Sequence, residues 1–208
     1  MEERAGALGD LLDLADALPQ GRRPKDGEPL VGKVLTVHSA FDRAGLHHAF
    51  GGAIALAYYG EPRVTIDVDV NLFAPLHEWP AIKAAFAGLG LASDIGHEEL
   101  RRDREVRIRW DRNDIHLFFG GDALHGTMPD AVREVPFGDG TIPIVSAEHL
   151  IVRKAMLDRP KDWPDIEAIL TATGDLDVEE IVAWAQRLSS PDDPRVTKLR
   201  EAIARPCS

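Results

Sequence analysis

The sequence has little cysteine and no long apolar run, and each absence excludes a class of protein. Its single cysteine, Cys207, cannot form an intramolecular disulfide, which is typical of proteins from a reducing compartment, so we expect a cytoplasmic protein. No apolar run approaches the roughly 20 residues that a membrane helix needs, and we expect no membrane partner. The first stretch, "MEERAGALGDLLDLADALPQ", lacks the apolar region of a secretory signal.

Basic residues are also few relative to acidic ones. The 24 Lys and Arg against 35 Asp and Glu give a formal net charge of −11, which does not favour non-specific binding to a nucleic-acid backbone. One segment is an exception, and its arginines are Arg101, Arg102, Arg104, Arg107, Arg109 and Arg112. They are typical either of a solvated pair of strands or of a patch that guides the phosphates of RNA or a nucleotide.

The spacing of apolar residues predicts an α+β fold. Helical spacing covers residues 7–18, 30–45, 53–59 and 76–89, and strands are predicted at 47–50 and 64–73. Two hairpins should follow, over 104–119 with its turn at 111–113, and over 132–145 with its turn at 138–140. From residue 146 the pattern is helical, with breaks at Pro160, Gly174 and Pro191–Pro194. We therefore expect a mixed β-sheet core flanked by helices in residues 1–145, and a C-terminal helical lobe in residues 146–208.

The predicted strand at 64–73 carries two carboxylates on one side. Asp67 and Asp69 are two residues apart, so they should point to the same face, opposite Val68 and Val70. Two solvated acids on an exposed strand face would give the same pattern. As a metal site, the pair predicts Mg²⁺ or Mn²⁺ shared with the phosphates of a nucleoside triphosphate (NTP), because Mg²⁺ usually takes one or two carboxylates plus substrate phosphates.

A glycine pair precedes this strand. Gly51 and Gly52 follow a predicted strand and open a predicted helix, where backbone N–H groups can bind phosphates and a ligand can approach closely. Alone, the pair would also fit a simple turn. The ordered set of strand, Gly-Gly, helix and Asp-x-Asp strand is more specific, and it resembles the nucleotidyltransferase superfamily of the DNA polymerase β type.

The stretch "GGAIALAYYGEPRVTIDVDV" is more narrowly similar to the AbiE-type and MenT-type toxin nucleotidyltransferases of bacterial toxin–antitoxin systems, and "HLIVRKAMLDRPKDWPDIEAIL" resembles their later helical segment. The resemblance covers about residues 47–170. It implies transfer of a nucleoside monophosphate (NMP) from an NTP to an acceptor, RNA at a tRNA 3′ end, and a cognate antitoxin partner. It also implies that Arg63, Thr65 and Lys154 bind the nucleotide, with Lys154 contacting phosphate.

The resemblance further implies a third functional acid, and the residues leave its identity open. Asp114 is the candidate on a neighbouring strand. An even number of loop residues would place Arg107 and Arg109 on the same hairpin face as Asp114 and His116, where an ordinary Asp–Arg cross-strand pair is the alternative. The eight histidines show no zinc-ligand spacing.

A functional aspartate is also implied at the predicted helix start "KDWPD", and Asp165 is preferred over Asp162, which helix capping would explain. Ser146 should cap the helix that carries Lys154. Without the resemblance, Lys154 would be interpreted as a surface lysine paired with Asp158 one turn later.

Four other functions share parts of this pattern. A haloacid-dehalogenase-type phosphatase would need alternating parallel strands and helices after the Asp-x-Asp motif, where two hairpins are predicted instead. A glycosyltransferase would need a longer chain. The remaining alternatives are transfer of the NMP to a protein target and a non-catalytic relative that binds a nucleotide or a partner.

Overall fold

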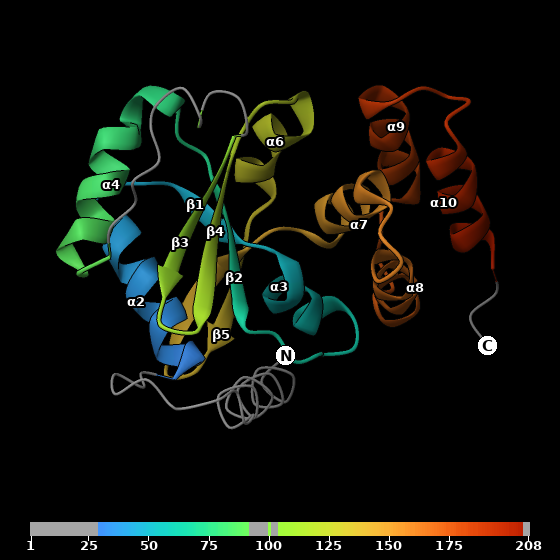
Figure 1. Cartoon of the computed structure of the whole chain (residues 1–208). Coiled ribbons are helices and arrows are strands. Elements are labelled where there is room, and N and C mark those ends of the chain that lie inside the picture. The colour runs from blue at the N-terminus through green and yellow to red at the C-terminus, as the bar shows by residue number, and fades with distance from the viewer. Residues whose placement is uncertain (1–28, 92–99, 101–103, 206–208) are drawn as a thin grey trace.

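Six strands form one mixed sheet in the order β3-β4-β2-β1-β6-β5 (Figure 1). The computed structural model describes residues 29–91, 100 and 104–205. The strands are β1 (His48–Phe50), β2 (Asp67–Leu72), β3 (Glu105–Trp110), β4 (Asn113–Phe119), β5 (Arg133–Phe137) and β6 (Gly140–Ile144). The antiparallel hairpins β3–β4 and β5–β6 form the two edges, the pairs β2–β4 and β1–β6 are parallel, and β1–β2 is antiparallel. The mixed sheet and both predicted hairpins are confirmed.

One face of the sheet is apolar and packs against two helices. Val68 and Val70 of β2 are fully buried, with Leu117 of β4 beside them, and burial of each such side chain stabilises the fold by about 1.5–3 kcal/mol. Helices α2 (Leu30–Arg43) and α4 (Trp79–Gly88) cover this side (Figure 1). Phe41 of α2 and Phe86 of α4 meet edge to face, with ring centroids 5.3 Å apart.

Helix α3 (Gly52–Tyr59) lies on the other side of the sheet, between the strands and the C-terminal helices. Seven of its eight residues are buried, as expected for a helix that is apolar all round. Its last residue ties the two parts together, because the Tyr59 hydroxyl donates to the Val145 carbonyl oxygen at 2.9 Å and the Thr173 hydroxyl donates to the Tyr59 carbonyl oxygen at 3.0 Å.

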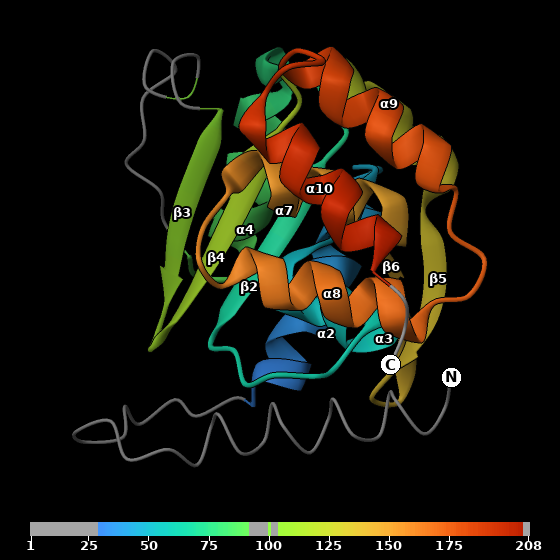
Figure 2. The ribbon, with the colours of Figure 1, turned by 90° about the vertical axis from the view of Figure 1, so that its right-hand side faces the viewer.

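Four helices follow the sheet in chain order: α7 (Ala147–Leu157), α8 (Asp162–Ala172), α9 (Val178–Leu188) and α10 (Pro194–Ala204). They stack over one face of the sheet, and β3 and β4 extend beyond them (Figure 2). The predicted breaks between them are confirmed, although Pro194 begins α10 rather than only interrupting the helix. In the described part of the chain, no helix is both long enough and apolar enough to cross a membrane.

Some predicted bounds were wrong. The strand predicted from residue 64 begins at Asp67, because the Asp67 N–H donates to the Thr65 hydroxyl rather than to a neighbouring strand. The helix predicted over 76–89 is a 3₁₀ turn, Leu76–Glu78, followed by α4. The short helix α6 (Ala123–Thr127) and a 3₁₀ turn, Met128–Ala131, were not predicted. The helix predicted over 7–18 lies outside the described residues.

Candidate active site

Polar side chains gather on the face of the sheet opposite the apolar core. The parallel register of β2 and β4 sets Asp67 beside Asp114 and Asp69 beside His116. Since paired residues in neighbouring strands point to the same side, these four side chains share one surface, here called the acid face. The sequence placed Asp67 and Asp69 together, and the structure adds Asp114 and His116 to them.

The β3–β4 hairpin brings two arginines to the same surface. Arg109 pairs with Asp114 and Arg107 with His116 in the antiparallel register. The two arginines therefore lie on the same hairpin face as Asp114 and His116, as expected for a loop with an even number of residues. Arg109 Nε lies 2.7 Å from Asp114 Oδ1. Arg104 is described by the structure, whereas Arg101 and Arg102 of the basic segment lie outside the described residues.

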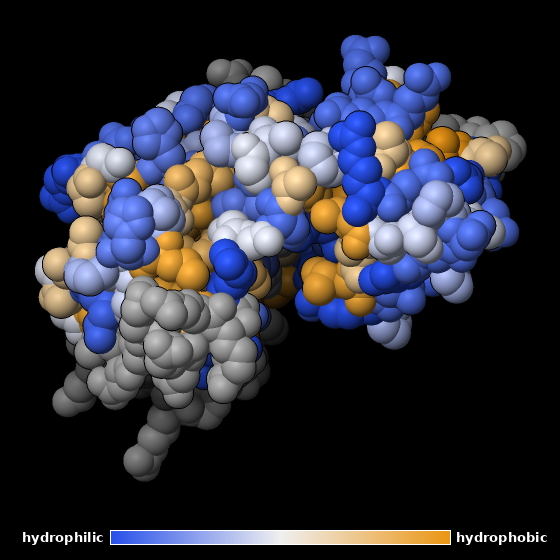
Figure 3. All heavy atoms as spheres, turned by 90° about the horizontal axis from the view of Figure 1, so that it is seen from above, coloured by the Kyte–Doolittle hydropathy of each residue, from blue (hydrophilic) through white to orange (hydrophobic). Residues whose placement is uncertain are grey.

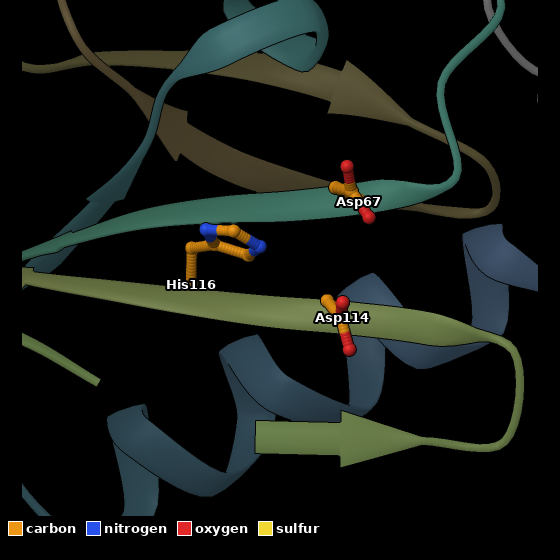
Figure 4. A group of neighbouring side chains, drawn as sticks. All are labelled: Asp67, Asp114 and His116. Atoms are coloured by element: carbon orange, nitrogen blue, oxygen red, sulfur yellow. The ribbon is translucent and has the colours of Figure 1, made fainter. Parts of the chain in front are cut away.

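Three residues of the acid face are arranged as a metal-binding group. One ligand atom from each of Asp67, Asp114 and His116 lies within 4.8 Å of the other two. Figure 4 shows the His116 ring lying along the surface toward the two carboxylates. Buried Asp114 Oδ1 accepts no hydrogen bond, although Arg109 is close, and a buried acceptor of this kind normally has a partner. The donor set therefore fits a divalent cation.

Asp69 points toward the glycine pair instead of into that group. Gly51 caps α3, and its N–H donates to the Asp69 carbonyl oxygen at 2.9 Å. Gly52 has φ +53°, and a Cβ there would lie 1.8 Å from Asp69 Oδ2. A Cβ at Gly51 would lie 2.9 Å from Asn71 Nδ2. Gly52 therefore requires glycine because of its positive φ and its contact with Asp69, whereas a Cβ at Gly51 would displace only the end of the Asn71 side chain. The first turn of α3 opens beside the acid face.

Burial raises the pKa of the Asp69 carboxyl above its usual range, and the charge of Asp67 acts in the same direction. The charges of His116, Arg159 and Lys154 lower it in part. Lys154 lies on α7 and Arg159 in the connection from α7 to α8, so cations of that part of the chain are close enough to influence the acid face.

These cations belong to a second group of charges, here called the cationic cluster, made of Arg63, Lys154, Arg159, Asp162 and Asp165. Lys154 is only 3% exposed, and its Nζ lies 2.5 Å from Asp165 Oδ2 and 3.8 Å from Asp162 Oδ1. The alternative of a surface lysine paired with Asp158 is therefore wrong. The residue is buried because α8 folds back against α7.

The two arginines complete the cluster. Arg159 binds Asp162 through Nε at 2.7 Å and Nη2 at 3.0 Å, and it keeps 47% of its side chain exposed. Its pKa is raised chiefly by the hydrogen bond to Asp162 and further by the charge of Asp69. Arg63 Nε lies 3.4 Å from Asp165 Oδ1. Three cations thus surround two acids, which leaves an excess of positive charge.

The capping explanation for Asp162 is wrong. Lys161 is the N-cap of α8, and the Asp162 carboxylate accepts from the backbone N–H and guanidinium of Arg159. Although burial opposes the shift, these contacts hold the pKa of Asp162 below its usual range. Ser146 does cap α7, because its hydroxyl accepts from the His149 N–H.

A buried lysine holds the hairpin that carries Asp114. Lys33 of α2 is 2% exposed and lies 2.6 Å from Asn113 Oδ1 and 2.9 Å from Asp111 Oδ2. Asn113 Nδ2 in turn donates to the Ile66 carbonyl oxygen just before β2. These contacts fix the turn that immediately precedes Asp114 and join it to the start of β2.

The sequence analysis did not identify Lys33, His116 or Arg159 as site residues. The hairpin parity was the only signal for His116. Lys33 lies in no motif, and Arg159 lies within the segment "HLIVRKAMLDRPKDWPDIEAIL" but was not singled out there. The predicted residues Arg63 and Thr65 are both placed between α3 and β2, where Arg63 contacts the cationic cluster and Thr65 binds the backbone of Asp67.

The acid face is an open surface and not a closed pocket. Figure 3 shows a hollow between the part formed by the sheet and the part formed by the C-terminal helices. A separate cavity of about 240 Å³, whose lining includes His38, His47 and Glu134, lies at the other end of β1 and β2, and no residue of the acid face lines it.

Comparison with known families finds a match over most of the chain. The family described as "Nucleotidyl transferase AbiEii toxin, Type IV TA system" matches residues 39–205. A search of curated proteins found no match.

Solved structures with similar folds were also found. ANT(2")-Ia in complex with adenylyl-2"-tobramycin is 15% identical, with a TM-score of 0.54, and the match covers 84% of this chain and 98% of that one. The lincosamide antibiotic adenylyltransferase LnuA, lincomycin-bound, is 13% identical, with a TM-score of 0.49 over 68% of this chain and 96% of the other. The first of these shows that the fold is that of a nucleotidyltransferase.

Proposed function

The chain belongs to the AbiEii nucleotidyltransferase toxin family, and from that premise we propose that its acid face catalyses NMP transfer from an NTP to the 3′ end of an RNA, in the role of a toxin. Membership makes the chain a nucleotidyltransferase. The metal, the acceptor and the biological role are the parts that we propose.

The main support for the proposal is that the negatively charged acid face lies near the positively charged cationic cluster. The acid face has three carboxylates and one close arginine partner, whereas the cationic cluster has three cations around two acids. Asp69 lies within the electrostatic reach of Lys154 and Arg159. A triphosphate with its cation fits between such surfaces, because the metal meets the carboxylates and the phosphate oxygens meet the basic side chains.

Asp67 and Asp114 would hold the cation, and Asp69 would join them when its carboxylate turns from the glycine pair toward the other two. When bound, Mg²⁺ or Mn²⁺ would offset the negative charge of the phosphates and orient them for in-line attack. Gly51 and Gly52 leave the backbone N–H groups at the start of α3 open to phosphate oxygens.

The basic residues would hold the triphosphate from the opposite side. Arg159 is the most exposed cation of the cluster, so we propose that it contacts phosphate together with Lys154, while Thr65 and Arg63 keep the segment before β2 in place. Asp165 and Asp162 orient Lys154 and Arg159 by the ion pairs described above.

Asp114 is the proposed base that accepts the proton of the attacking hydroxyl group. It is largely buried on the acid face beside Asp67, so one of its oxygens can bind the cation while the other accepts the proton. Arg107 and Arg109 on the same face would steer the RNA backbone, which overall charge alone does not favour.

The test is to incubate the protein with total RNA, a protein extract and each labelled NTP in turn. Label in RNA that is lost after 3′ trimming supports the proposal, and label in protein makes the chain a modifier of proteins. Nucleotide binding without any transfer would favour the non-catalytic alternative. Arg107→Glu with Arg109→Glu should reduce RNA labelling and the steepness of its salt dependence, while NTP binding is retained.

A further inference from the structure

We propose that His116 supplies an imidazole nitrogen to the cation of the acid face, so that this site prefers Mn²⁺, or another divalent ion of the d-block, over Mg²⁺. This inference rests on the proposed function for the presence of a cation. It goes further by adding a nitrogen to the ligand set and by naming the preferred class of ion.

The first support is the position of the ring. His116 is paired with Asp69 in the register of β2 and β4, and its ligand nitrogen lies within 4.8 Å of carboxylate oxygens of Asp67 and Asp114. Ligand atoms about 2.1 Å from one ion can be at most about 4.2 Å apart. Small rotations of the side chains are therefore enough to close the group around an ion (Figure 4).

The second support is the orientation of the ring. His116 Nδ1 lies 3.2 Å from Glu105 Oε1, and a carboxylate can only accept, so Nδ1 carries the proton. This contact leaves the lone pair of Nε2 for another partner. Metal-binding histidines commonly have a carboxylate on the nitrogen that does not bind the ion, and Glu105 occupies that place.

The third support comes from Asp114. Its Oδ1 is buried without a hydrogen bond, and Arg109 Nε at 2.7 Å does not approach in a hydrogen-bonding direction. Asp114 is 9% exposed, so water reaches it poorly. An unpartnered oxygen beside an imidazole with a free nitrogen is the arrangement that a cation would complete.

The choice of ion follows from the ligand atoms. Mg²⁺ takes oxygen ligands almost entirely and retains several waters. Imidazole suits d-block ions, whose affinity for mixed nitrogen and oxygen sites rises from Mn²⁺ toward Cu²⁺. A site with one imidazole among its carboxylates should therefore favour Mn²⁺ over Mg²⁺, and replacement of the imidazole by a carboxylate should reverse that preference.

A purely structural role for His116 is the competing explanation, since its contact with Glu105 would also join β3 to β4. The two explanations predict different measurable effects of replacing His116. A structural pair affects the free energy of unfolding, whereas a ligand affects the coordination of Mn²⁺.

The experiment measures Mn²⁺ bound to tag-free protein by electron paramagnetic resonance, with Mg²⁺ as competitor, with and without a non-hydrolysable NTP analogue. The nitrogen of a bound imidazole is detected by its ¹⁴N modulation of the Mn²⁺ spin echo. The variants are His116→Gln, His116→Asp, Glu105→Gln and Asp67→Asn, and exposed His77→Gln is the matched control.

We expect the wild type and His77→Gln to show the nitrogen signal and at least about tenfold preference for Mn²⁺. His116→Gln should lose the signal and most of the Mn²⁺ affinity, and His116→Asp should shift the preference toward Mg²⁺. Glu105→Gln should keep the signal with affinity lowered about 10–100-fold, the range for outer-shell partners, and it serves as the second variant if His116→Gln does not fold.

An absent nitrogen signal in the wild type, or equal Mn²⁺ affinity in His116→Gln and His77→Gln, would overturn the inference. If Asp67→Asn loses Mn²⁺ in that case, the proposed metal-dependent function still stands. If no variant and no nucleotide condition binds either ion, both the inference and the metal in the proposed function are wrong.

Discussion

The acid face and the cationic cluster both combine carboxylates with basic side chains, but they differ in how completely the carboxylates are paired with cations. In the cluster, each carboxylate has a cation within hydrogen-bonding distance, at 2.5 Å for Asp165 and 2.7 Å for Asp162. On the acid face, three carboxylates share one close arginine. Paired charges can be retained for structure alone, whereas carboxylates that lie close together with a single cationic partner repel one another and indicate a missing cation.

The two regions also differ in how the chain builds them. Lys154, Asp162 and Asp165 lie on two successive helices and Arg159 lies in the connection between them, so Arg63 is the one member of the cluster that comes from elsewhere. The acid face is assembled from strands that are distant in sequence, and its alignment depends on the register between them. Its geometry is therefore more sensitive to contacts made outside the site.

The largest expected effect is on the rate at the acid face. Asp69→Asn should lower NMP transfer about 10³-fold, because a metal-ion site supplies several kcal/mol of charge stabilisation. Its free energy of unfolding without metal should be unchanged or higher, since the repulsion from Asp67 and the cost of burying a charge are removed. Label transfer and urea unfolding measure the two quantities.

The matched control for this prediction is Asp139→Asn, the same change at an exposed turn. It should leave both quantities at their wild-type values. Transfer by Asp69→Asn above a tenth of the wild-type rate would contradict the assignment of this carboxylate to the reaction.

The second prediction concerns stability in the cationic cluster. Asp165→Ala leaves Lys154 buried without its closest partner, and loss of one member of a buried ion pair costs about 3–5 kcal/mol in the free energy of unfolding. The double variant Lys154→Met with Asp165→Leu should recover most of this loss while remaining inactive. Urea unfolding measures the loss and the recovery.

Glu167→Ala is the control on the same helix, because its ion pair with Arg205 is about half exposed and should contribute less than about 1 kcal/mol. Equal stability of Asp165→Ala and Glu167→Ala would show that the cluster is not held by its internal pairs.

The smallest expected effect lies at the connection between the hairpin and α2. Lys33→Met removes the ion pair with Asp111 and the hydrogen bond to Asn113, and a hydrogen bond from a charged donor contributes about 1.5–3 kcal/mol. NMP transfer should also fall, by less than in Asp69→Asn, because Asp114 follows this turn directly. Urea unfolding and label transfer are measured for Lys33→Met and for the exposed control Lys161→Met. Equal stability of the two variants would show that Lys33 does not hold the β3–β4 turn in place.

The sequence predicted the parts of the site that depend on local spacing. The alternation of β2 placed Asp67 and Asp69 on one face, and the glycine pair marked the start of α3, because both signals lie within a few residues. His116 could not be joined to Asp69 in the same way, since the parallel register of β2 and β4 is a non-local property.

Local sequence patterns also did not predict which charged side chains are buried. Lys154 is spaced on α7 like a surface residue, and it is buried only because α8 packs beside it. Asp162 fits a capping position by sequence, but Arg159 takes its carboxylate. The interpretations of Lys154 and Asp162 were wrong for the same reason. In each case the actual partner of the side chain is brought close only by the packing of the folded chain, which local spacing does not predict.

The parallel pairing of β2 with β4 has a consequence for how the protein acquires activity. Parallel partners need a long intervening segment, and closing that segment costs entropy before the contacts form, so such pairings tend to be slow steps of folding. A chain still emerging from the ribosome can form α3 and β2 before β4 is made, but it has no complete ligand set. We therefore expect the ligand set of the acid face to be completed only after β4 has been made and has paired with β2, and activity to wait further for the helices that carry the cationic cluster.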